Sequence, residues 1–93
     1  MNANLEWVNL NGAQLENANL RNANLSGACL EKANLSNANL EQAILNNTDL
    51  RNSNLTNTNF INASVKNARF GSNIGISEEV EFYLKRQGAI VED

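Results

Sequence analysis

Leucine recurs at every fifth position over the first 55 residues of this 93-residue chain. The series consists of Leu5, Leu10, Leu15, Leu20, Leu25, Leu30, Leu35, Leu40, Leu45, Leu50 and Leu55. It continues in the same phase with Phe60, Val65 and Phe70. A strict short repeat constrains the fold more than local propensity does, because each unit must bury its apolar residue against neighbouring units.

A second series of small residues keeps the same period and lies two positions before the first. Its members are Ala3, Val8, Ala13, Ala18, Ala23, Ala28, Ala33, Ala38, Ala43, Thr48, Ser53, Thr58, Ala63 and Ala68. Asn usually stands between the two series, as in Ala18-Asn19-Leu20. We therefore expect the leucine and the small residue of each unit to point inward, and the other three residues to point outward.

A period of five fits neither a regular helix nor a flat strand. In an α-helix, residues five apart are rotated by about 140°, so the leucines would form no stripe. In a strand they would alternate between faces, because five is odd. The pattern is satisfied if the chain turns a corner every five residues and four sides close a coil. Stacked coils would then pair by β-type hydrogen bonds about 4.8 Å apart.

The residue types suit such a coil. Leucine fills the axis of a narrow tube, and the inward site nearer the wall admits only Ala, Ser, Thr or Val. The chain holds 20 Asn, a residue that tolerates left-handed and turn conformations. A disordered Asn-rich tract is the rival interpretation. The strict phase and the 42% content of hydrophobic residues argue against it.

These units resemble the pentapeptide-repeat family, whose pattern is a small residue, Asp or Asn, Leu and two variable residues. The resemblance covers residues 3 to about 72, where fourteen consecutive units keep phase without an insertion. The departures from the pattern are Gln14, Cys29, Ile44, Thr48, Ser53, Thr58, Phe60, Ser64, Arg69 and Phe70. The resemblance implies an all-β solenoid, a right-handed quadrilateral parallel β-helix. Its length would give roughly 3.5 coils and a rod about 17 Å long at the spacing of β-strands.

The end of the chain leaves the repeat and predicts a different element. We expect residues 1–76 to form the β-helix and residues 77–93 to form a capping helix and tail. Ser77 is a favourable N-cap, acids follow it in the first turn, and Gly88 is a plausible stop. The predicted helix covers residues 77–87. Its apolar positions toward the last coil would be Val80, Tyr83 and Leu84, together with Gln87, and residues 89–91 would be extended.

The N-terminal end has no comparable cover, because the repeat begins almost at Met1. An exposed coil end is a strand edge with apolar filling, which favours association. Two explanations remain open: the chain is cut from a longer protein, or two copies form a homodimer through this coil. Trp7 occupies an outward position in the first coil, where it would either contact a partner or lie on the wall.

The sequence contains few residues suited to catalysis or metal binding. It has no His, and its single Cys excludes an internal disulfide. Cys29 is expected to stack below Asp49 and Arg69, without a base to activate it. Glu31 with Arg51, and Arg21 with Glu41, are expected to pair across adjacent coils. We therefore expect no catalytic, metal-binding or cofactor-binding residues and no enzymatic activity.

Two outward isoleucines interrupt the polar exterior. Ile44 and Ile61 are predicted to flank the same corner, and with Trp7 they are the candidate contacts for a partner. Single exposed apolar residues are also normal on protein surfaces. The chain shows neither a secretion signal nor a segment long enough for a membrane span, so we expect a cytoplasmic protein without membrane contact.

Charge separates two classes of function. The resemblance raises the alternative that the rod mimics double-stranded DNA and modulates DNA gyrase. A mimic about 17 Å long would need on the order of ten negative charges. Residues 1–76 carry five acids and five bases, and no basic face suggests that the rod binds nucleic acid directly. We therefore predict a non-enzymatic structural or protein–protein interaction module, whose protein partner the sequence does not identify.

Overall fold

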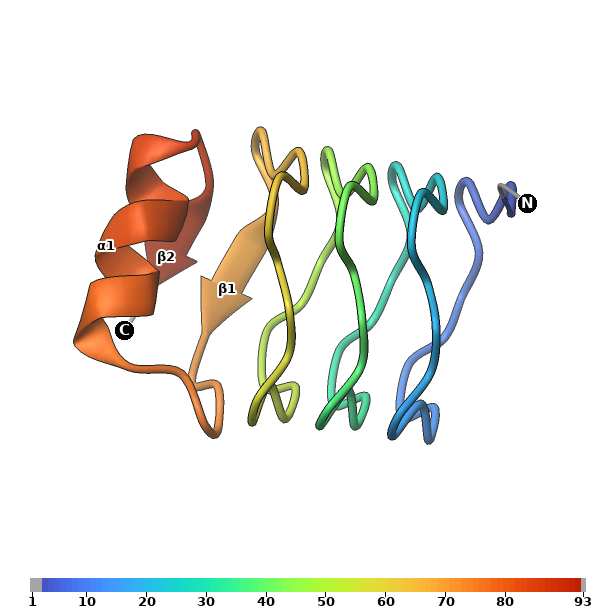
Figure 1. Cartoon of the computed structure of the whole chain (residues 1–93), viewed down its shortest axis with the longest axis horizontal. Coiled ribbons are helices and arrows are strands. Elements are labelled where there is room, and N and C mark those ends of the chain that lie inside the picture. The colour runs from blue at the N-terminus through green and yellow to red at the C-terminus, as the bar shows by residue number, and fades with distance from the viewer. Residues whose placement is uncertain (1–2, 93) are drawn as a thin grey trace.

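Parallel β-bridges join residues twenty apart along the computed structural model, which describes residues 3–92. The bridges recur every five residues, so four sides make one coil (Figure 1). The first coil pairs with the second through Asn4↔Asn24, Asn9↔Cys29, Gln14↔Asn34 and Asn19↔Asn39. Later coils continue the same four columns, and the chain measures 32 × 23 × 19 Å. The period of five therefore produces the four-sided coil that the sequence predicts.

Each bridge is held by two backbone hydrogen bonds. Asn24 donates its N–H to the carbonyl of Ala3 at 2.8 Å and accepts from the N–H of Leu5 at 2.7 Å. Each corner is closed within one coil, as where the Ala13 N–H donates to the Leu10 carbonyl at 3.0 Å. The pattern satisfies backbone groups on both sides of every inner coil, so the repeat stabilises itself by stacking.

The second residue of each corner adopts a left-handed conformation. Residues with positive φ at this place are Trp7, Gly12, Asn17, Asn22, Gly27, Lys32, Asn37, Gln42, Asn47, Asn52, Asn57, Asn62 and Asn67. Asn and Gly adopt this region at lower cost than other residues, which explains their frequency. Where a different Asn stands in the middle of a side, its side chain caps the next corner. The side-chain oxygen of Asn34, for example, accepts the N–H of Ser36 at 3.0 Å.

The fourth coil is incomplete. Three of its sides pair with the coil below, through Ile44↔Ser64, Asp49↔Arg69 and Asn54↔Ile74. Strand β1 (Arg69–Gly71) belongs to this coil, and strand β2 (Ile90–Glu92) pairs with it in parallel on its far side. A Cβ at Gly71 would lie 2.5 Å from the Glu92 carbonyl oxygen, so glycine permits the close approach of β2. The fourth side of this coil would pair with Asn59. Within residues 3–92, Asn59 forms a bridge with Asn39 of the preceding coil and with no residue of the following one.

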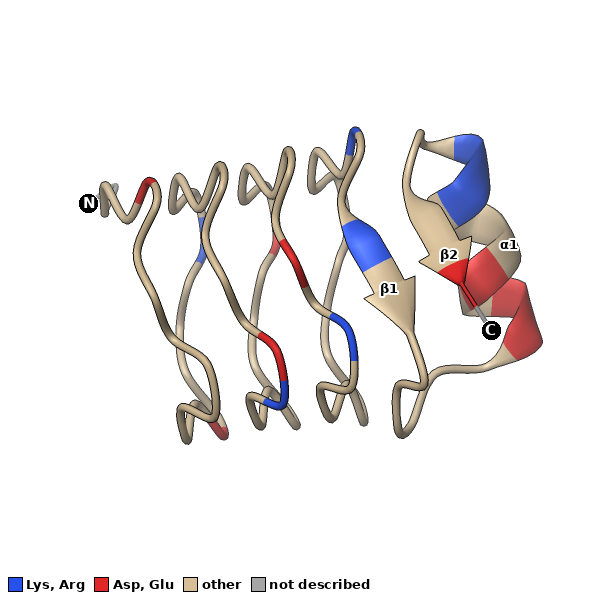
Figure 2. Ribbon diagram, turned by 180° about the vertical axis from the view of Figure 1, so that it is seen from behind, with Lys and Arg blue, Asp and Glu red and all other residues tan. Residues whose placement is uncertain are grey.

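Helix α1 (Glu78–Arg86) lies beyond the last coil (Figure 1). The Ser77 hydroxyl oxygen accepts the Val80 N–H at 3.2 Å, which is the N-cap that the sequence predicts. The helix begins with three acids and ends with two bases (Figure 2). Only Leu84 of α1 is buried, whereas Tyr83 and Phe82 remain exposed. The expectation that Val80, Tyr83 and Leu84 all pack against the coil is therefore only partly correct.

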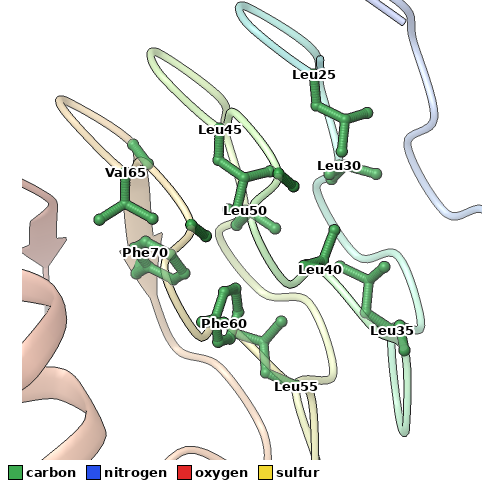
Figure 3. Close-up of a cluster of buried hydrophobic side chains, with 14 of the residues drawn as sticks. Leu25, Leu30, Leu35, Leu40, Leu45, Leu50, Leu55, Phe60, Val65 and Phe70 are labelled. Atoms are coloured by element: carbon green, nitrogen blue, oxygen red, sulfur yellow. The ribbon is translucent and has the colours of Figure 1, made fainter. Parts of the chain in front are cut away.

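The interior of the rod is a column of leucine and phenylalanine side chains (Figure 3). Leucines from Leu25 to Leu50 are fully buried, and the small residues beside them are buried as well. Phe60 and Phe70 meet edge to face, with ring centroids 6.0 Å apart. The buried hydroxyl of Thr48 donates to the Leu25 carbonyl at 2.7 Å. The polar substitutions at the small position are therefore satisfied by hydrogen bonds.

Candidate interaction surfaces

The ring of Trp7 contacts the wall of the rod at Gly27. Its side chain is 76% exposed, but its ring covers Gly27 in the next coil. A Cβ at Gly27 would lie 2.3 Å from two atoms of the ring. The ring therefore rests on the second coil at a place where only glycine leaves room. The contact with Gly27 places the ring on the wall, and the exposed remainder of Trp7 leaves partner contact as a prediction.

Replacing Gly27 by Ala is expected to displace the ring of Trp7 and change its fluorescence, because the new Cβ overlaps the ring. Gly12→Ala is the matched control, since Gly12 occupies an equivalent corner with φ of 72° and nothing within 4 Å of its Cβ position. The free energy of unfolding of both variants should fall by about 1 kcal/mol, because alanine is strained at a positive φ. The chain has one Trp, so an emission spectrum and a urea titration separate the two effects. Identical spectra in the two variants would contradict the contact.

Ile44 and Ile61 have different surroundings. Ile44 lies in the first column between Asn24 and Ser64 and is 38% exposed. Ile61 is 57% exposed and contributes to a pocket beside α1 that does not include Ile44. The two isoleucines are therefore unequal candidates for partner contact, since Ile61 lines the pocket beside α1 and Ile44 does not.

The first coil leaves the core partly open at its outer end. Leu5, Leu10, Leu15 and Leu20 are only half-buried, whereas their equivalents in the second coil are buried. Backbone bonds of this coil run toward the second coil, as from Leu10 N–H to the Cys29 carbonyl at 2.8 Å. This end therefore presents both an apolar centre and a β edge.

A hollow with a mainly apolar lining lies between α1 and the rod. One pocket of about 330 Å³ is lined by residues 58–62 together with Val80 and Tyr83. A second, of about 190 Å³, lies between Leu55, Phe60, Ile76, Val80 and their neighbours. Both pockets include Thr58, Phe60 and Val80, and we call them together the C-terminal groove. This groove was not predicted from the sequence. The predicted count of about 3.5 coils already indicates, however, that the last coil lacks part of its four sides.

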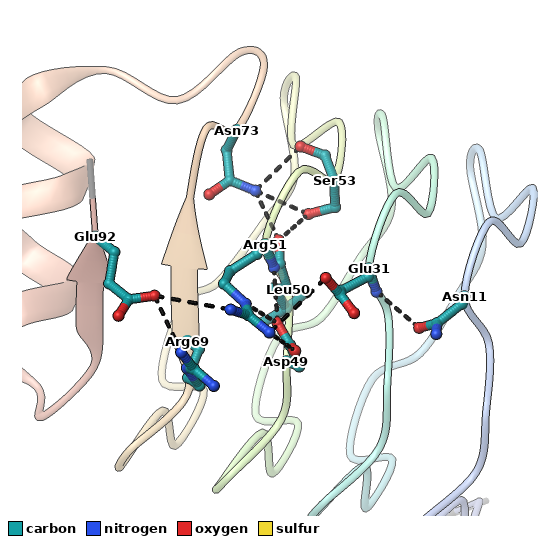
Figure 4. A network of polar contacts seen from close by, with 9 residues as sticks. All are labelled: Asn11, Glu31, Asp49, Leu50, Arg51, Ser53, Arg69, Asn73 and Glu92. Carbon is teal, nitrogen blue, oxygen red and sulfur yellow. Dashed lines mark hydrogen bonds and ion pairs between the residues drawn. The ribbon is translucent and has the colours of Figure 1, made fainter.

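A network of charges covers the second column near the C-terminal end (Figure 4). Arg51 donates twice to the Asp49 carboxylate, at 2.9 and 2.6 Å, and lies 3.8 Å from Glu31. Glu92 of β2 lies 3.2 Å from Arg69 and 4.0 Å from Arg51. The hydrogen bonds from Arg51 lower the pKa of Asp49 below its ordinary value. The network links β2 to the rod, and its charges are paired with one another.

The predicted ladder pairs are confirmed. Arg21 lies 3.0 Å from Glu41, and Arg51 lies 3.8 Å from Glu31. The sequence did not indicate that Asp49 would be the strongest partner of Arg51. That contact joins side chains two residues apart at a corner, and it depends on the local turn.

The described residues show no cluster suited to metal binding. Between residues 3 and 92, no group of three or more His, Cys, Asp or Glu side chains gathers around one point. Cys29 is half-buried in the second column between Asn9 and Asp49, as the register predicts. Helix α1, the one helix in the same part of the chain, is too short to cross a membrane.

Comparison with known proteins shows what the chain is similar to. The family model for pentapeptide repeats matches residues 1–37 and 33–71, with eight copies. The crystal structure of alr5209, a pentapeptide repeat protein from Nostoc PCC 7120, is 30% identical with a TM-score of 0.66. That match covers 98% of this chain and 78% of alr5209. No match was found among curated proteins.

Two further solved structures are more distant. One is a pentapeptide repeat protein from the thylakoid lumen of Arabidopsis thaliana, at 17% identity and a TM-score of 0.46, covering 97% of this chain and 79% of that one. The other is HetL, a pentapeptide repeat protein involved in heterocyst differentiation regulation in Nostoc sp. strain PCC 7120. It shares 24% identity at a TM-score of 0.42, over 96% of this chain and 38% of HetL.

The family match and the geometry agree. The repeat model spans residues 1–71, and the bridged columns run from Asn4 to Ile74. Pentapeptide repeat proteins imply a right-handed quadrilateral β-helix. With its model matched over residues 1–71, the chain belongs to the pentapeptide repeat family.

Proposed function

We propose that this protein is a non-enzymatic module that binds another protein. The supporting observation is the distribution of its exposed apolar side chains. Among the described residues, six of the eight large ones gather toward the C-terminal end: Ile61, Ile74, Val80, Phe82, Tyr83 and Ile90. Exposed apolar side chains concentrated in one region favour an interaction surface over a purely solvated wall.

The proposal includes the finer architecture of the rod. About 3.5 coils of repeat stack on one another, and α1 covers the last of them. The full burial of Leu84 and the pairing of β2 with β1 support this covering role. The opposite end, with its half-buried Leu5, Leu10, Leu15 and Leu20, would be the place where two copies associate. A cross-section of about 23 × 19 Å makes such a contact small, so the homodimer would be weak.

The DNA-mimic alternative has less support. A mimic of DNA needs a dense row of negative charges along its surface. The rod shows few charges and both signs, while acids gather on α1 (Figure 2). Several of the rod's carboxylates, including Asp49, Glu31 and Glu41, lie within ion-pair distance of arginines. We therefore favour binding to a protein.

Affinity capture tests the proposal. The folded rod is immobilised beside the Leu35→Asp variant, which should not fold, and proteins retained from a lysate of the source cell are identified by mass spectrometry. The expected result is one protein retained only by the folded rod. Its purified form should then bind with a saturable isotherm in calorimetry. If the rod retains only itself, self-association replaces hetero-association; if calorimetry shows no saturable binding, the proposal fails.

A further inference from the structure

The unfilled side of the last coil leaves two backbone groups without a partner. One coil earlier, the Ala38 carbonyl accepts the Asn59 N–H at 3.0 Å and the Leu40 N–H donates to the Asn59 carbonyl at 2.8 Å. The equivalent groups in the next coil are the Thr58 carbonyl and the Phe60 N–H. Neither forms a hydrogen bond with any residue between 3 and 92. The fold therefore presents a short β edge with a known pairing geometry.

Helix α1 occupies the space beyond this edge but does not pair with it. Its own backbone is bonded within the helix, as from Glu81 N–H to the Ser77 carbonyl at 3.0 Å. Val80 and Tyr83 face the edge across the C-terminal groove and leave the pocket of about 330 Å³. An occupant of this groove would therefore meet both an apolar wall and a free backbone donor and acceptor.

The first turn of α1, from which Val80 lines the groove, is acidic. Glu78, Glu79 and Glu81 form the first turn of α1, next to Val80 (Figure 2). None of these three carboxylates forms an ion pair with a residue of the described chain. The rod side of the groove is uncharged, since it consists of residues 58–62. A cationic side chain on the occupant would complement this acidic turn.

We propose that the C-terminal groove binds an extended peptide segment of a partner protein. One residue of the segment pairs with Thr58 and Phe60 in the way that Asn59 pairs with Ala38 and Leu40. An apolar side chain of the segment enters the pocket beside Ile61 and Tyr83, and a Lys or Arg faces the first turn of α1. This is addition of a strand to an open edge, in which the backbone gives affinity and a side-chain pocket gives selectivity. The inference rests on the proposed function and names its site.

A peptide selection tests the site even while the partner is unidentified. Random heptapeptides displayed on phage are selected on the immobilised full chain, and the most enriched peptide is synthesised with a fluorescent label. The enriched sequences should combine an apolar residue with a nearby Lys or Arg. Anisotropy then measures affinity for the wild type, Ile61→Arg and Ile44→Arg. Both isoleucines are exposed, so neither variant should affect folding, and a urea titration verifies this.

The two arginine variants form a matched pair. Ile61→Arg removes an apolar wall of the groove and repels a cationic peptide, so affinity should fall by about tenfold or more. Ile44→Arg adds the same charge outside the pocket, one coil away from its lining, and should leave the affinity within about twofold. Glu79→Gln should weaken binding by a smaller factor, and added salt should reduce the difference between it and the wild type.

Hydrogen exchange reports the backbone pairing itself. In the free protein the Phe60 amide should exchange faster than the Leu40 amide, because only the latter is hydrogen-bonded. Saturation with the peptide should slow the exchange of Phe60 by about tenfold, as expected for a newly bonded amide in a complex. The same peptide N-methylated at the residue that pairs should give no protection.

The outcomes distinguish this inference from the function on which it rests. If a partner protein binds but Ile61→Arg has no more effect than Ile44→Arg, the site is wrong and the function stands. If selection enriches no peptide, or the bound peptide leaves Phe60 unprotected, strand addition is overturned. If neither a protein nor a peptide binds, both proposals fail. Protection of Phe60 that increases with protein concentration alone would identify a second copy as the occupant and also overturn the inference.

Discussion

Replacing Leu35 by aspartate is expected to abolish cooperative folding of the rod. Leu35 is fully buried in the second coil, surrounded by other fully buried leucines. The change removes about 1.5–3 kcal/mol of apolar burial and adds the cost of an unpaired charge, several kcal/mol more. A domain of this size has a stability of only about 5–15 kcal/mol. Circular dichroism during a thermal scan should show no unfolding transition.

The control for this variant is an outward position of the same coil. Asn37 is exposed and has φ of 61°, so glycine is the replacement that keeps its backbone conformation without strain. Asn37→Gly should unfold cooperatively with a stability within about 0.5 kcal/mol of the wild type. If Leu35→Asp and Asn37→Gly unfolded alike, the assignment of inward and outward positions would be wrong.

Phe70→Ala is expected to cause the second largest loss of stability, about 3–5 kcal/mol in urea denaturation. Phe70 is fully buried in β1 and meets Phe60 edge to face at 6.0 Å. Truncation to alanine leaves a cavity at the junction between the last coil and the terminal elements. Because β2 pairs with β1 at this residue, the loss should also loosen the C-terminal end.

Phe70→Leu provides the matched comparison. Leucine occupies the equivalent place in most units of the repeat, so it fits the interior of the rod. It fills most of the volume of the phenylalanine ring and leaves only a small cavity. Its cost should lie below about 1.5 kcal/mol. Equal losses for the alanine and leucine variants would show that the aromatic contact, and not the filled volume, stabilises this junction.

Much of the architecture follows from the sequence because the repeat fixes each coil locally. A corner every five residues and four sides per coil place residues twenty apart in the same column. Cys29, Asp49 and Arg69 accordingly occupy one column, as predicted. The pair of Arg21 with Glu41 follows from the same arithmetic. The helix at the C-terminal end was also predictable, since Ser77 is a local capping signal.

The candidate sites were less predictable. Of the three residues selected from the sequence, Ile61 lines the pocket beside α1, and the contact of Trp7 with Gly27 was not anticipated. An outward position in a repeat indicates that the side chain points away from the core. It does not say what that side chain meets, because the answer depends on the neighbours in the next coil and on the terminal elements.

The sequence by itself determined the four-sided coil, its columns and its inward-facing residues, because the hydrogen bonding and packing of one unit repeat in the next. Only the tertiary structure decided how the C-terminal elements lie against the last coil. The chain leaves the repeat after Ile74, α1 lies beyond the last coil, and β2 returns to pair with β1. These placements depend on contacts between segments that share no period. The C-terminal groove arises there for the same reason: three sides of the last coil are filled, and the fourth is left open beside Phe60.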